Sequence, residues 1–99
     1  MIKNIRHTGI VVNDLEKSLW FYKEKMGFSV FKHSEESGDF IENILDLENL
    51  AVTTVKLALK NNQMIELLDF NTHKRDASES FINDIGPTHL AFTVSNLDK

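Results

Sequence analysis

Five short stretches of the chain, rich in β-branched and apolar residues, have the pattern of β-strands. The first of them, NIRHTGIVV, alternates in side-chain character, so that His7 and Gly9 share one face while Ile10 lies on the other. Turn-forming or polar residues separate the stretches from one another. The predicted strands cover residues 4–12, 27–33, 51–60, 63–70 and 88–94.

A helix is predicted between the first two strands, from about residue 14 to residue 26. Its apolar residues recur at i, i+4, i+7 and i+11 and form one stripe, namely Leu15, Leu19, Tyr22 and Met26. Asn13 or Asp14 provides the N-cap, and Gly27 stands where helices commonly end in a left-handed turn. The polar SEESGD segment predicts a loop, and FIENILD a short helical turn.

Asn61 and Asn62 predict a tight hairpin between the third and fourth strands, because asparagine tolerates a positive φ. The element order is therefore β-α-β-β-β, followed by a connector and one more strand. This order predicts an α+β fold.

The chain repeats itself. HTGIVVNDLEK, which begins at His7, aligns without a gap with HLAFTVSNLDK, which begins at His89 and ends at Lys99. Any junction between a strand and a helix produces some likeness, but a duplicated unit explains the identities better. We therefore expect a first β-α-β-β-β module with its connector over residues 1–86. Residues 87–99 are expected to be the first strand and helix cap of an incomplete second module, so that the chain is truncated.

Composition and charge narrow the function. The formal charge of −4 and the lack of a large basic cluster argue against nucleic acid as a partner. No apolar run is long enough to span a membrane, and MIKN lacks the apolar core of a signal peptide, so we expect a cytoplasmic protein. The absence of Cys excludes thiolate ligands and a thiol nucleophile.

Three side chains are candidate metal ligands. A lone strand histidine such as His7 is more often a surface residue, but His89 occupies the same place in the second copy. Glu66 shares a strand face with Met64 and Leu68, where a carboxylate is costly to bury unless it is paired or metal-bound. An edge position open to water is the alternative for Glu66. His7, Glu66 and His89 together predict a divalent metal site with room for a substrate.

The segments HTGIVVNDLEKSLWFYKEKMGF, MIELLDF and GPTHLAFTVSNLDK resemble the vicinal-oxygen-chelate superfamily, the glyoxalase, bleomycin-resistance and dioxygenase group. The resemblance implies paired β-α-β-β-β modules whose curved sheet holds a divalent metal ion (Zn, Ni, Mn, Co or Fe). It also implies metal ligands at His7, Glu66 and His89, and a fourth at a Glu beyond Lys99.

Glu66 makes the pattern closest to glyoxalase I, so the resemblance implies a lactoylglutathione lyase-like metalloenzyme. Such a lyase or isomerase polarises the vicinal oxygens of a small carbonyl substrate while a carboxylate moves a proton. The missing Glu is favoured for that step over Glu66. The alternatives are a metal-free, antibiotic-type binding module and a methylmalonyl-CoA epimerase-like isomerase, in which Gln often stands at the place of Glu66. A homodimer, with or without exchange of residues 87–99, would complete the unfinished sheet.

Overall fold

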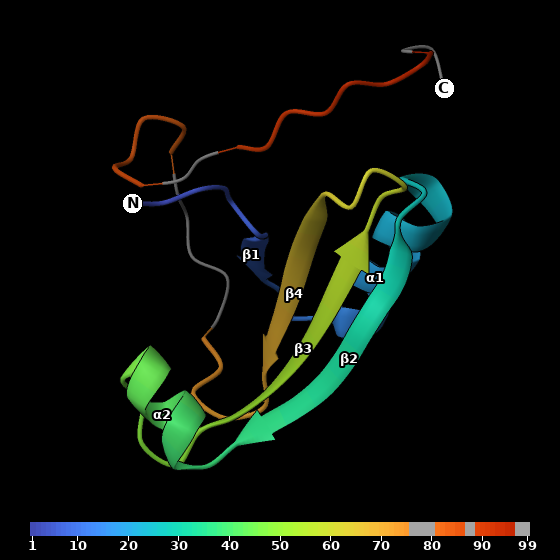
Figure 1. Cartoon of the computed structure of the whole chain (residues 1–99). Helices are drawn as coiled ribbons and strands as arrows, with labels where there is room; N and C mark the ends of the chain where they lie inside the picture. The colour runs from blue at the N-terminus through green and yellow to red at the C-terminus, as the bar shows by residue number, and fades with distance from the viewer. Residues whose placement is uncertain (76–80, 87–88, 97–99) are drawn as a thin grey trace.

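The computed structural model describes residues 1–75, 81–86 and 89–96 of the 99-residue chain. It is a mixed α+β structure with one four-stranded sheet (Figure 1). The strands are β1 (Thr8–Val11), β2 (Ser29–Ser37), β3 (Ala51–Ala58) and β4 (Met64–Phe70). The helices are α1 (Leu15–Trp20), which continues as the π-helical turn η1 (Phe21–Lys25), and α2 (Asp39–Leu45).

The sheet has the order β1-β4-β3-β2. β1 and β4 run parallel, whereas β4 with β3 and β3 with β2 are antiparallel pairs. The first strand of the chain therefore lies beside the last strand of the sheet. The order of elements along the chain confirms the predicted β-α-β-β-β order, with the short helix α2 between β2 and β3.

The core lies between α1 and one face of the sheet, which we name the α1 face. Four residues from the two central strands are buried there, namely Val55, Leu57, Ile65 and Leu67, and Phe28 joins them. The predicted helix stripe packs against this cluster, with all four of its members in contact: Leu15, Leu19, Tyr22 and Met26. Because side chains alternate along a strand, the residues between these core positions lie on the opposite face.

The ends of the first helix are as the sequence predicts. The carboxylate of Asp14 accepts a hydrogen bond from the backbone N–H of Lys17 at 3.1 Å, which identifies Asp14 as the N-cap. Gly27 has a φ of 82°, a conformation that costs glycine little. These two residues fix where the chain leaves β1 and where it enters β2.

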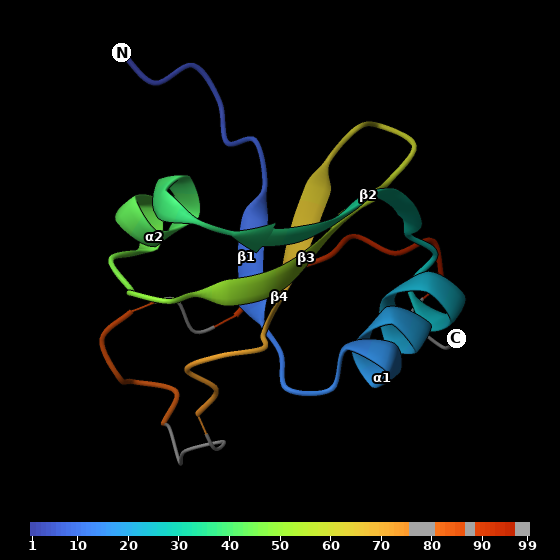
Figure 2. The ribbon, with the colours of Figure 1, turned by 90° about the horizontal axis from the view of Figure 1, so that it is seen from below.

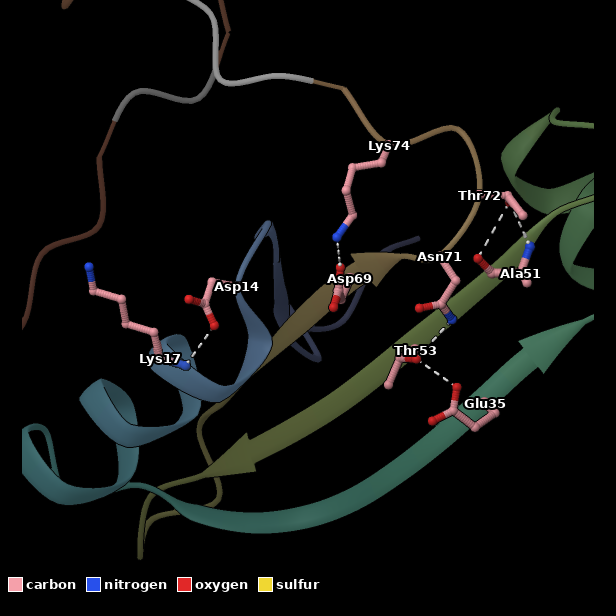
Figure 3. A network of polar contacts seen from close by, with 9 residues as sticks. All are labelled: Asp14, Lys17, Glu35, Ala51, Thr53, Asp69, Asn71, Thr72 and Lys74. Atoms are coloured by element: carbon pink, nitrogen blue, oxygen red, sulfur yellow. Dashed lines mark hydrogen bonds and ion pairs between the residues drawn. The ribbon is translucent and has the colours of Figure 1, made fainter.

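β2 is longer than the sequence predicts, and part of the expected polar loop belongs to it. The hydroxyl of Thr53 donates to the Glu35 carboxylate at 2.6 Å, and that of Thr54 donates to Glu36 at 3.2 Å. Asn71 donates to Thr53 at 3.0 Å, so a small polar network ties β2, β3 and the segment after β4 together (Figure 3). Polar residues thus extend this edge strand by cross-strand hydrogen bonds.

The hairpin between β3 and β4 lies where the two asparagines predict it, but its loop has three residues. Leu59 N–H donates to the carbonyl of Gln63 at 2.9 Å, and Asn62 has a φ of 67°. A three-residue loop that ends in a left-handed residue is a common hairpin form. Its length sets the register that places Lys56 opposite Glu66.

The strand expected over residues 88–94 is not formed in this structure. Thr88 lies outside the described residues, and residues 89–94 carry no strand pairing. This segment runs beside the α1 side of the sheet (Figure 2). There the rings of Phe92 and Phe28 pack edge to face, with their centroids 6.3 Å apart. A strand needs backbone hydrogen bonds from a neighbour, and these residues pair with neither edge strand.

Candidate functional site

The sheet face opposite α1, which we name the Glu66 face, brings two of the predicted ligands together. His7 Nε2 lies 3.5 Å from Glu66 Oε1. His7 directly precedes β1, and Glu66 lies in β4, so the parallel pairing of these strands creates the contact. Both side chains are largely covered, with 27% of His7 and 15% of Glu66 exposed. Glu66 is therefore no water-exposed edge carboxylate, and its contact with His7 offsets the cost of its burial.

Gly9 makes room beside this pair. It is the register partner of Glu66 in β1, and a Cβ at this position would lie 3.2 Å from Cδ1 of Leu68. A larger side chain would therefore crowd both the leucine and the space next to the carboxylate. The glycine lets the Leu68 side chain lie close against β1 beside Glu66.

Two lysines continue the same row across the sheet. The register pairs Glu66 with Lys56 of β3, and Lys56 with Lys32 of β2. The row from β1 to β2 thus reads glycine, glutamate, lysine, lysine. The sequence pattern does not mark these lysines, although it shows the hairpin position and the charge of Lys56. What the sequence does not give is the exact length of the loop between β3 and β4. A loop one residue longer or shorter shifts the strand register, and Lys56 then lies on the opposite face of the sheet.

His89 does not join the other two candidates. It is exposed, and it lies in the segment after the sheet rather than on a strand. Among the described residues, no group of three His, Cys, Asp or Glu side chains is close enough to hold a metal ion. The structure therefore brings together His7 and Glu66 and leaves His89 outside their site.

The chemistry of the pair suits a divalent cation. A metal bound by one imidazole nitrogen at about 2.1 Å and one carboxylate oxygen at about 2.1 Å in tetrahedral geometry holds them about 3.4 Å apart. The observed 3.5 Å between Nε2 and Oε1 matches that separation. Imidazole and carboxylate are also ligands that zinc, nickel, iron and manganese accept. The spacing of His7 and Glu66 is therefore compatible with two ligands of a four-coordinate ion.

Comparisons with known proteins agree with this fold. The family model of the Glyoxalase/Bleomycin resistance protein/Dioxygenase superfamily matches residues 4–99. The chain is 33% identical, over 101 aligned positions, to the uncharacterized protein YwkD of Bacillus subtilis. That alignment covers 100% of this chain and 67% of YwkD. The chain belongs to the glyoxalase/bleomycin resistance/dioxygenase superfamily.

Solved structures show the same architecture. The crystal structure of a glyoxalase family protein from Bacillus cereus superposes with a TM-score of 0.88 at 22% identity, covering 99% of this chain and 67% of that one. The crystal structure of SMU.1112c superposes less closely, with a TM-score of 0.53 at 14% identity. At these identities the likeness concerns the fold alone. It confirms the α+β fold predicted from the sequence, while the family model confirms the family resemblance.

None of the helices in the described ranges is both long enough and apolar enough to cross a bilayer.

Proposed function

We propose that His7 and Glu66 bind a divalent metal ion and that the protein is a metal-dependent lyase or isomerase of the glyoxalase I type. The observation that supports this most is the 3.5 Å separation of the imidazole nitrogen and the carboxylate oxygen on the Glu66 face. The 1–86 module would supply these two ligands. His89, which repeats the position of His7 in the sequence, is the proposed third ligand from residues 87–99.

The metal ion, when bound, would polarise the vicinal oxygens of a small carbonyl substrate and make the neighbouring C–H more acidic. The protein's own residues would do the rest. His7 and Glu66 would hold the ion at a fixed place on the sheet. Gly9 would let Leu68 pack close to β1 and hold the edge of the site beside the carboxylate. A second carboxylate would move the proton, because a Glu66 that is bound to metal is a weaker base.

Metal binding can be tested by titrating the protein with Ni²⁺ in a calorimeter. His7→Ala and Glu66→Gln should each weaken binding at least tenfold, which corresponds to about 1.4 kcal/mol. The His33–Glu35 pair provides a matched control, because its nitrogen and oxygen lie 3.3 Å apart but both side chains are exposed. His33→Ala should leave the affinity unchanged. A wild-type protein that binds no Ni²⁺, Zn²⁺ or Co²⁺ would contradict the proposal.

The His7–Glu66 contact itself supports a second candidate, a metal-free module that binds a small molecule. The His7 imidazole lies close enough to the Glu66 carboxylate to offset the cost of its burial without any metal. In that case Glu66→Gln should leave ligand binding intact in metal-free buffer. Ligand binding that is lost on metal removal and restored by adding metal would exclude this candidate.

A further inference from the structure

We propose that Lys32 and Lys56 bind an anionic oxygen group, a carboxylate or a phosphate, of the ligand that reacts at His7 and Glu66. The inference rests on the proposed function only in taking His7 and Glu66 as the place where the reacting end of the ligand lies. Lys56 lies directly opposite Glu66 in the register, and Lys32 lies directly opposite Lys56. Residues paired in this way in an antiparallel sheet project from the same face. Both lysines therefore lie on the Glu66 face.

A β-bulge in β2 produces this arrangement. The register shifts between Val30 and Lys32, so Phe31 is the extra residue and Lys32 becomes the partner of Lys56. Without the bulge, continuous pairing from Val30 and Leu57 would set Phe31 opposite Lys56. Bulges commonly re-aim a side chain near a functional site. Here the bulge exchanges an aromatic neighbour of Lys56 for a second positive charge.

Among the described residues, neither lysine ammonium is in an ion pair, although Lys56 lies across the sheet from the Glu66 carboxylate and Lys32 has no such neighbour. Over the described ranges, the ion pairs are His7–Glu66, His33–Glu35 and Lys74–Asp69. Like charges placed directly opposite each other in a sheet repel. The repulsion is notable in a chain whose formal charge is −4. An anion between the two ammonium groups would turn the repulsion into two favourable contacts.

The geometry also limits the ligand. Adjacent strands lie about 4.8 Å apart, so the backbone of Lys32 lies about 10 Å from that of Glu66, with Lys56 between them. A ligand that meets the lysines with its anionic end and Glu66 with its reacting end needs only a few bonds between these two groups. The structure therefore points to a short oxo acid or a small phosphorylated carbonyl compound. A neutral dicarbonyl compound would leave the lysines unused.

The experiment measures anion binding to metal-free protein, prepared over a chelating resin, so that it does not depend on the metal proposal. ¹⁵N-labelled protein is titrated with malonate, with inorganic phosphate and with neutral malonamide, and dissociation constants are taken from amide shifts around Lys56. Lys56→Met should weaken anion binding at least fivefold, and Lys32→Met at least twofold. Lys56→Arg should retain it. Lys60→Met, in the exposed hairpin loop, provides the matched control.

Tighter binding of malonate would assign the pair to a carboxylate, and tighter binding of phosphate to a phosphoryl group. Either result supports the inference. Equal affinities in the wild type, Lys56→Met and Lys32→Met would overturn it, as would equal binding of malonamide. A folded spectrum of Lys56→Met, together with retained binding in Lys56→Arg, distinguishes lost binding from lost structure. Failure of Ni²⁺ binding in a separate titration would overturn the metal proposal alone.

Discussion

His7 Nε2 lies 3.5 Å from Glu66 Oε1 because β1 and β4, the sheet strands that come first and last along the sequence, pair in parallel. The contact depends on a long-range strand pairing rather than on any local motif. It brings an imidazole nitrogen and a carboxylate oxygen together on the Glu66 face. In the row of residues paired across the strands, Glu66 is joined by a glycine and two lysines. We therefore expect metal binding at this site to change both with substitutions of His7 or Glu66 and with substitutions that disturb the packing of β1 against β4.

Metal binding should stabilise the folded protein. A ligand that binds only the native state at a hundred times its dissociation constant adds about 2.7 kcal/mol. For a domain of this size, that corresponds to an increase in Tm of roughly 10 °C or more. We expect Ni²⁺ to raise the Tm of the wild-type protein by this amount in a calorimetric scan.

The same scan on Glu66→Gln should show a much smaller increase, because the amide oxygen is a poor metal ligand. His33→Ala, which changes the exposed His–Glu pair, should respond to Ni²⁺ like the wild type. An equal Tm increase in all three proteins would mean that the ion binds elsewhere.

Gly9→Val should destabilise the fold and weaken metal binding together. A Cβ at this position would already lie 3.2 Å from Leu68 Cδ1, and the branched side chain adds further atoms beside Glu66. Overpacking of this kind costs roughly 1–3 kcal/mol. The measurement is urea unfolding followed by Ni²⁺ titration. Leu68→Ala in the same chain should recover part of the lost stability, and an additive double variant would contradict a direct clash.

The local elements could be predicted from the sequence because each depends on neighbouring residues. The stripe from Leu15 to Met26 has helical spacing, and all its members contact the core. Asp14 caps the helix and Gly27 ends it with a positive φ, as their residue types indicate. The sequence also predicts that His7 and Glu66 belong to one site, because the repeat singles out His7 and the strand pattern singles out Glu66.

The remaining features depend on long-range pairing, which local pattern does not specify. Ser34 to Ser37 have the composition of a loop, yet Thr53 and Thr54 hold them in β2 by hydrogen bonds to glutamates. Lys56 faces Glu66 only because the hairpin loop has three residues. His89 was expected on a strand, and its segment finds no strand neighbour in this structure.

Adjacent leucines in β4 should respond very differently to truncation. Leu67 is fully buried on the α1 face, while Leu68 lies on the Glu66 face and is only partly buried. Leu67→Ala should lower the free energy of unfolding by about 2–5 kcal/mol, a large part of the stability of a small domain. Leu68→Ala should cost clearly less. Urea unfolding of both variants measures the difference, and equal losses would show that the two faces are wrongly assigned.

Thr53 provides a test of the polar network at the other end of the sheet. Its side chain is 6% exposed, and its hydroxyl donates to Glu35 at 2.6 Å while it accepts from Asn71 at 3.0 Å. Thr53→Val keeps the shape and removes both bonds. Because Glu35 and Asn71 are exposed, water can replace their lost partner, so the expected cost is about 1 kcal/mol in urea unfolding. Thr54→Val, which removes a single bond of 3.2 Å to Glu36, is the matched control and should cost less. A Thr53→Val protein as stable as the wild type would mean that the network does not stabilise the extended end of β2.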